Sequence, residues 1–254
     1  MVSQEKFPVA FEIGPKRRVF AQALEWIGWC RAGKDEATAL DQLLAVGLRY
    51  AMVAAQAGFP FVAPLSVEAF EVVERMRGSG TTDFGALAVL LTSDQEPFEE
   101  GETERPCRLV TACWATFDEA LHRISVDLHE VKPERGRSPS AMRFHLLETD
   151  LLHLSAFGPI FRQPDPTQVA EQEATVREQL LAQLAAIPPK EVLAPHRRYG
   201  FVLTPRFAVR RSAWHALDHA WELQDRYQEV IRTSLPDFLK TLDSSQTRGK
   251  CPTM

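Results

Sequence analysis

Cysteine is scarce in this chain. The 254 residues include four cysteines, Cys30, Cys107, Cys113 and Cys251, and none of them forms a CxxC pair. Their spacing excludes a zinc knuckle and does not fit a disulfide framework. Because Cys107 and Cys113 fall in an apolar helical pattern, we expect them to be core thiols.

Long apolar runs are also missing. No uninterrupted run approaches the roughly 18 residues of a membrane-spanning helix, and the N-terminal stretch MVSQEKFPVAFEIGPKRR contains no hydrophobic signal core. We therefore expect a cytoplasmic protein with no membrane partner. The net charge of −5 argues against a broad attraction to nucleic acid, so no nucleic-acid partner is expected, although a small basic patch is compatible with this charge.

The common nucleophile and phosphate-binding motifs are absent as well. The chain contains no GxSxG, P-loop or GxGxxG motif. What is present is ordinary globular composition, with 45% hydrophobic and 25% charged residues. A packed core is therefore expected, and any chemistry has to come from other residues.

The first 80 residues alternate short apolar segments with turn signals. Residues 9–13 and 18–25 predict two strands joined by the turn GPKR, and GWCRAG is a candidate third strand. Asp35 is a suitable N-cap for one helix that runs to about residue 58, and residues 69–77 alternate like a further strand. This pattern predicts an α+β module over residues 1–80.

Residues 81–105 are acidic and lack clear periodicity, which predicts a linker in which residues 86–92 could form a short helix. From residue 106 to 254 the pattern is helical. Apolar stripes predict an all-α four-helix bundle followed by a short C-terminal helix, with the four long helices at residues 106–128, 139–156, 167–187 and 206–228.

The fourth of these helices carries the stretch RRSAWHALDHAWELQDR. On a helical wheel Trp214 and Trp221 share one face, which we expect to pack in the bundle, and a polar wedge beside it holds His215, Asp218, His219 and Glu222. Residues four apart on a helix are neighbours, so His215 and His219 can direct their imidazoles at one ion.

A third histidine completes a candidate metal site. His145 lies beside the apolar stripe of the second helix, and bundles build metal sites from facing helices. In the alternative interpretation the wedge faces solvent and its charges form exposed ion pairs. The remaining helical histidines, including His122, His129 and His153, are expected at the surface or at its boundary.

The stretch VFAQALEWIGWCRAGKDEATALDQLLAVGLRY resembles the HicB antitoxin type of module. The matching turn positions are Gly28, Gly33, Lys34, Asp35 and Glu36. Ile27 stands where the family's bend has proline, and no DNA-binding segment follows. The resemblance therefore implies the α+β fold and no antitoxin function.

The last 150 residues resemble the DinB-like four-helix bundle, a family of metal-dependent proteins, some of which transfer thiols. This resemblance implies that His145, His215 and His219 bind a divalent metal ion such as zinc, nickel or manganese. The fourth helix departs from the family's Arg-Gly-Gln-like end, since it reads HAWELQDR. In an alternative register His219 matches the first motif histidine and Leu223 replaces the second.

These patterns predict a metal-dependent transferase or hydrolase that acts on a small molecule or a thiol. Asp218 or Glu222 would orient a ligand imidazole or move a proton. The alternative is a non-enzymatic two-domain protein that binds a small molecule or a protein and has a degenerate metal site. Tryptophan-rich helical faces often pair, so a homodimer is also expected.

Overall fold

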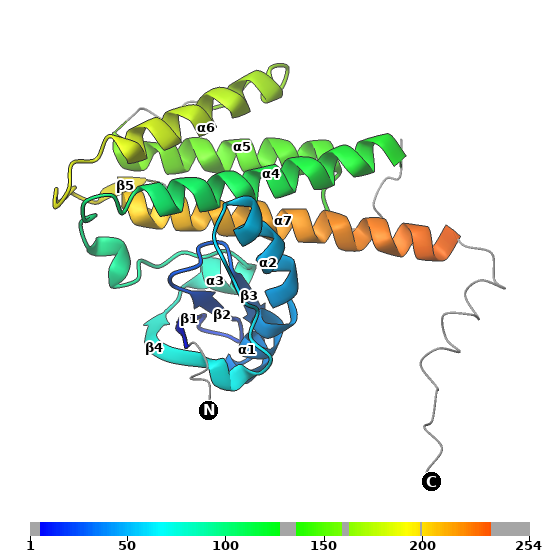
Figure 1. The fold of residues 1–254 in the computed structure, drawn as a ribbon. Coiled ribbons are helices and arrows are strands. Elements are labelled where there is room, and N and C mark those ends of the chain that lie inside the picture. The colour runs from blue at the N-terminus through cyan, green and yellow to red at the C-terminus, as the bar shows by residue number, and fades with distance from the viewer. Residues whose placement is uncertain (1–5, 128–135, 159–162, 199, 235–254) are drawn as a thin grey trace, which may run out of the picture.

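The computed structural model describes residues 6–127, 136–158, 163–198 and 200–234. These residues form an α+β protein in which a four-stranded N-terminal sheet lies against a layer of long helices (Figure 1). The predicted α+β class is therefore confirmed. The expected short C-terminal helix, together with Leu128, His129 and Cys251, lies outside the described residues.

The sheet has the strand order β3-β2-β1-β4, with β1 at Phe7–Ile13, β2 at Val19–Ala23, β3 at Cys30–Gly33 and β4 at Phe70–Arg77. β1 is antiparallel to β2 and parallel to β4. One register row crosses all four strands: Arg77 lies opposite Ile13, Ile13 opposite Val19, and Val19 opposite Gly33. The turn between β1 and β2 therefore shares one end of the sheet with the last residues of β3 and β4.

Both faces of β2 are buried, since all five of its residues are inaccessible. Successive side chains of a strand point to opposite faces. Val19, Ala21 and Ala23 join the main core together with α1, whereas Phe20 packs with Trp214 of α7. The sheet therefore has α1 on one face and α7 on the other.

The single helix predicted after Asp35 is interrupted. The structure has α1 at Glu36–Ala45 and α2 at Gly47–Gln56. The bend lets both helices contact Trp29, whose Nε1 donates to the Leu43 carbonyl at 2.9 Å and whose ring stacks on Tyr50 at 5.7 Å. The helix thus breaks where both halves pack against the buried Trp29 indole. Periodicity alone does not show such a tertiary contact.

Four long helices form at the predicted positions: α4 at Glu104–Asp127, α5 at Pro139–Leu154, α6 at Val169–Ala185 and α7 at Pro205–Ser234. α4 packs along α7, α5 contacts α6 and α7, and α6 contacts α4. A hairpin of β5 (His196–Arg198) and β6 (Phe201–Leu203) precedes α7. It was not predicted, because strands of three residues are too short to show alternation.

α7 lies between the sheet and the other three long helices, α4, α5 and α6 (Figure 1). The expectation that Trp214 packs within the helical bundle is wrong, because its ring meets Phe20 of β2 edge-on at 5.6 Å. Trp221 also faces the N-terminal module, with the Arg31 guanidinium 4.3 Å from its ring centre. The tryptophan face of α7 is therefore the surface that covers the sheet.

The segment predicted as a linker is packed. It begins with α3 (Gly80–Phe84), and residues 86–92 carry no helix. Leu87 and Leu91 are fully buried, and the buried Glu12 carboxylate accepts hydrogen bonds from the Ala88 and Val89 amides. One hydrophobic core includes residues of both the sheet and the long helices. The predicted division into domains at residues 80 and 105 therefore stays a prediction.

One buried ion pair fastens this segment to α7. Arg210 donates to the Asp94 carboxylate and to the Gln22 side chain of β2, and Arg210 and Asp94 are 6% and 3% exposed. Removing one partner of a buried pair leaves an uncompensated charge, which costs about 3–5 kcal/mol.

We therefore expect Arg210→Met to lower the free energy of unfolding by about 3–5 kcal/mol. The matched control is Arg123→Met, whose exposed pair with Glu119 is worth about 0–1 kcal/mol. Urea denaturation of both variants measures the difference. Equal losses in the two variants would show that the buried pair contributes no more than a surface pair.

Candidate metal centre

Three histidines from two helices converge. His145 of α5 and His215 and His219 of α7 each offer one ring nitrogen, and these atoms lie within 4.8 Å of one another. The ring centres are 4.8 Å apart for His145 and His215, 5.6 Å for His145 and His219, and 4.7 Å for His215 and His219. The sequence prediction thus selected residues that the structure brings together.

The α7 pair has a spacing suited to a shared ion. The Nε2 atoms of His215 and His219 are 3.1 Å apart. Two nitrogens bound to one tetrahedral ion at about 2.05 Å would be about 3.3 Å apart, and at a right angle about 2.9 Å. The observed separation lies between these values, so this pair could share one ion as it stands. The three nitrogens together are spread over up to 4.8 Å, so His145 would have to approach the pair for all three to bind one ion.

The polar wedge does not face solvent at these positions. His215 and His219 are each 8% exposed, and His145 is half-buried. The Trp214 ring stacks on His215 at 5.7 Å, so the tryptophan that covers the sheet also supports a candidate ligand. The alternative in which these two histidines lie on an exposed face is therefore wrong.

Burial keeps the imidazoles in the form that binds metals. It lowers the pKa of His145 to about 4, and it lowers the pKa of His215 well below its ordinary value. The neighbouring histidines and arginines act in the same direction. Both rings are accordingly neutral at pH 7, and a neutral imidazole offers a lone pair to a cation.

Glu222 fixes the orientation of His219. The Nδ1 of His219 donates to a Glu222 carboxylate oxygen at 3.1 Å, and this hydrogen bond lowers the pKa of Glu222, as does the charge of Arg226. Arg226 holds the other carboxylate oxygen. With its proton on Nδ1, His219 directs the lone pair of Nε2 toward His215.

One ring nitrogen of the histidine cluster has no hydrogen-bond partner among the described residues. This atom is Nδ1 of His215, which is buried. A buried polar atom without a partner costs free energy. His215 therefore keeps its place through packing and through its Nε2, which faces His219.

Asp218, the other predicted catalytic residue, is engaged elsewhere. Its carboxylate is 2.7 Å from the Arg31 guanidinium of β3, and its side chain is 39% exposed. Burial raises its pKa, while Arg31 opposes that shift. Among the described residues it makes no hydrogen bond to a histidine, so its direct contact is with the sheet.

A second polar cluster escaped the sequence prediction. His153 was expected at the surface or its boundary, yet it is fully buried, so that expectation is wrong. Arg211 donates to its Nε2 at 2.9 Å, which places the proton on Nδ1, where Asp150 accepts at 3.4 Å. Asp150 also accepts from the Ser212 hydroxyl at 2.5 Å. The DxxH spacing on α5 is the signal that could have revealed this cluster.

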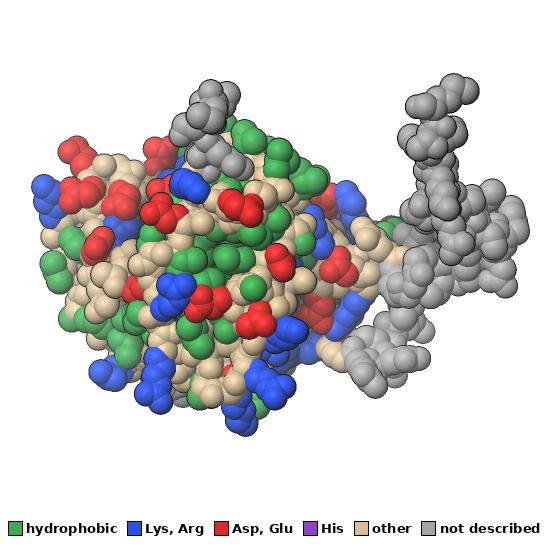
Figure 2. Space-filling model, turned by 90° about the horizontal axis from the view of Figure 1, so that it is seen from below, with side chains coloured by type: hydrophobic (Ala, Val, Ile, Leu, Met, Phe, Trp, Pro, Cys, Tyr) green, Lys and Arg blue, Asp and Glu red, His purple; other side chains and the backbone are tan. Residues whose placement is uncertain are grey.

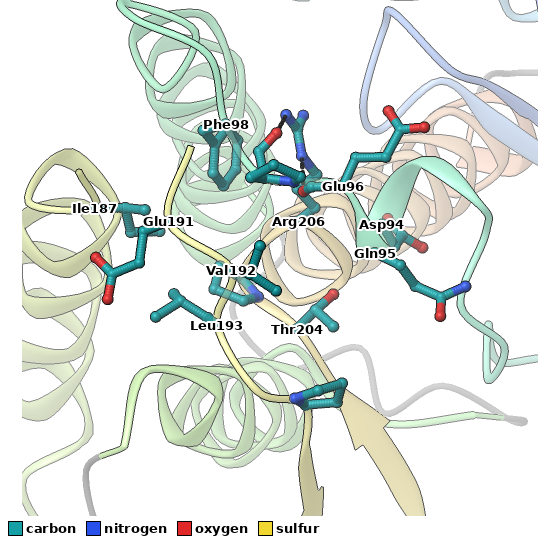
Figure 3. A pocket seen from close by; sticks show the side chains of 13 residues that line it. Asp94, Gln95, Glu96, Phe98, Ile187, Glu191, Val192, Leu193, Thr204 and Arg206 are labelled. Carbon is teal, nitrogen blue, oxygen red and sulfur yellow. Dashed lines mark hydrogen bonds between the residues drawn. The ribbon is translucent and has the colours of Figure 1, made fainter. Parts of the chain in front are cut away.

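Two hollows flank the beginning of α7, away from the histidines. The larger, of about 640 Å³, lies between the sheet module and the helices and is lined by Trp26, Phe98 and Arg105 among others. The smaller, of about 220 Å³, is shown in Figure 3, where Glu96 and Glu191 direct their carboxylates away from its centre. None of the three clustered histidines lines either hollow.

Comparisons of the chain with protein-family models, with curated proteins and with solved structures found no match. The described helices include none with the length and apolar character needed to cross a membrane. The geometry of the site is therefore the basis for any functional argument.

Three buried histidines predict a pH dependence of stability. Burial lowers the pKa of His145, His153 and His215 in the folded state, whereas the unfolded chain titrates near 6.5. Below about pH 6.5 the unfolded chain binds protons that the folded chain does not, so stability is present above this pH and is lost as the pH falls.

We expect the free energy of unfolding, measured in urea with a chelator present, to fall between pH 6.5 and 5. Each of the three histidines adds a slope of up to about 1.4 kcal/mol per pH unit. In His153→Gln the amide oxygen can still accept from Arg211, but the side chain no longer titrates. This variant should therefore reduce the slope by the contribution of one histidine. A stability that is constant between pH 7 and 5 would contradict the neutral, buried state of these rings.

Proposed function

We propose that this protein binds one divalent metal ion through His145, His215 and His219, and that its helical part is a DinB-like metal-dependent bundle joined to a HicB-like module. The observation that carries the proposal is the convergence of three imidazoles from two helices, two of which, those of His145 and His215, have lowered pKa values. The mutual contacts of the four long helices α4, α5, α6 and α7 support the DinB-like assignment.

The ligand set favours particular metals. Three imidazole nitrogens suit zinc or nickel, whereas manganese prefers oxygen ligands. The nearest carboxylate, that of Glu222, is occupied by His219 and Arg226. Zinc or nickel is therefore the better fit among the ions that the resemblance implies.

Three protein ligands leave one coordination position for water or a substrate. A metal ion there would act as a Lewis acid toward a small molecule or a thiol, which suits a transferase or a hydrolase. Glu222 contributes by holding the Nδ1 proton of His219 and strengthening that ring as a ligand. Asp218, paired with Arg31, would act only after that ion pair opens.

A second candidate function rests on the larger hollow. Its volume of about 640 Å³ lies in the usual range for a small-molecule site, and it sits at a junction between two parts of the fold. Its lining combines Trp26 and Phe98 with several charged side chains. In this function the histidine cluster is a degenerate metal site. The metal content of the wild-type protein separates the two candidates.

Elemental analysis of protein purified without a histidine tag tests the metal site. We expect about one zinc or nickel per chain, and loss of the metal in His215→Ala and in His219→Ala. His122→Ala, which changes a histidine of α4 outside the cluster, is the matched control. Glu222→Gln should weaken the affinity about 10- to 100-fold, as is typical when a partner of a ligand imidazole is changed.

Thermal unfolding gives an independent measurement. A metal at 100 times its dissociation constant stabilises the folded state by about 2.7 kcal/mol. Substoichiometric metal in the wild type that none of the substitutions alters, together with no stabilisation by zinc, nickel or manganese, would exclude the metal site.

A further inference from the structure

Five cations gather at one end of the sheet. Lys16, Arg17 and Arg18 form the turn between β1 and β2, Lys34 follows β3, and Arg77 ends β4. The register row through Ile13, Val19 and Gly33 brings these segments together. We name these five residues the basic sheet end.

The cations of the basic sheet end are free to bind a partner. All five residues are exposed, and within the described part of the chain none forms an ion pair with a carboxylate. An open hollow of about 490 Å³ lies among them, lined by Lys16, Arg17, Arg18, Lys34 and Asp83 in part. Lys and Arg side chains gather along the lower margin of the face seen in Figure 2, where acidic side chains are few.

The one carboxylate that lines this hollow, that of Asp83, already accepts backbone hydrogen bonds. Asp83 accepts hydrogen bonds from the backbone amides of Lys16, Arg17 and Arg18 at 3.0, 3.3 and 3.4 Å. Gly14 lies so close that a Cβ there would collide with this carboxylate. Asp83 therefore fixes the shape of the turn through backbone amides and, among the described residues, forms no ion pair with the three cationic side chains.

An aromatic ring adjoins the cations. Phe84 follows Asp83 directly and is 93% exposed, and the Arg18 guanidinium lies against the next residue, Gly85. The other large hydrophobic residues exposed to this degree in the described chain are aliphatic. An exposed ring beside unpaired cations is the combination that binds single strands, because cations contact phosphates and bases stack on the ring.

We propose that the basic sheet end binds single-stranded nucleic acid, with phosphates on the cations and a base stacked on Phe84. The row across four strands spans about 14 Å at about 4.8 Å per strand, so a short stretch of single strand can place several phosphates along the cations. The net charge of −5 does not prevent this, since charges more than about 8–10 Å away are screened at physiological salt.

An anionic membrane is the weaker partner for this surface. Binding to a bilayer requires several apolar side chains that enter the interface. The residues that line the hollow include no large apolar side chain, and Phe84 is the exposed hydrophobic residue that follows Asp83 in the chain. The site is separate from the histidine cluster, and nucleic acid binding there requires no metal ion.

Fluorescence polarisation of a labelled 12-nucleotide oligothymidine with the full chain, in a chelator, tests the proposal. We expect saturable binding that weakens with salt, with a log–log slope of about −0.7 for each phosphate contacted. Lys16→Glu/Arg17→Glu should weaken binding at least tenfold. Arg123→Glu/Lys190→Glu makes the same change in net charge at exposed positions elsewhere and should leave binding unchanged.

Phe84→Ala should weaken binding by about 5- to 150-fold, the equivalent of 1–3 kcal/mol for a stacked base, and Phe84→Tyr should restore it. Thermal melts confirm that each variant is folded. Equal losses in the two charge-reversal pairs, an unchanged affinity of Phe84→Ala, or binding to phosphatidylserine vesicles without binding to the oligonucleotide would each overturn the proposal. The chelator makes these outcomes independent of the metal site.

Discussion

The ion pair of Arg210 and Asp94 joins the three parts of this fold. Arg210 belongs to α7, Asp94 to the segment after α3, and Gln22, which also accepts from Arg210, to the middle of the sheet. A guanidinium in this position must be satisfied on all sides because the interior offers no water. The segment after α3 supplies two of the hydrogen-bond acceptors of Arg210, the Asp94 carboxylate and the Val89 carbonyl. The irregular conformation of this segment places both acceptors beside the buried guanidinium.

α7 presents two different sets of side chains on two faces of one helix. Trp214 and Trp221 cover the N-terminal module, and His215 and His219 face α5. Because Trp214 also stacks on His215, the position of the candidate ligand depends on how the helix sits on the sheet. A rotation of α7 about its axis would disturb the cover of the sheet and the histidine cluster together.

Local patterns predicted much of this structure. Apolar periodicity gave the four strands of the sheet and the four long helices, and the four-residue spacing of His215 and His219 identified the histidine cluster. The same patterns failed for His153 and for residues 86–92, because their burial depends on partners far along the chain, such as Arg211 for His153. The sequence patterns did not predict the basic sheet end either, because its residues are distant in sequence. Only the strand register brings Lys34 and Arg77 beside the turn.

The contact between β2 and α7 also sets an order of events during synthesis. Gln22 and Arg210 are 188 residues apart, and a ribosome needs about 10–40 s to add that length at about 5–20 residues per second. For this time the nascent sheet has no α7 to cover Phe20 or to bury Gln22. Phe20 therefore stays without its partner Trp214 until α7 has been synthesised.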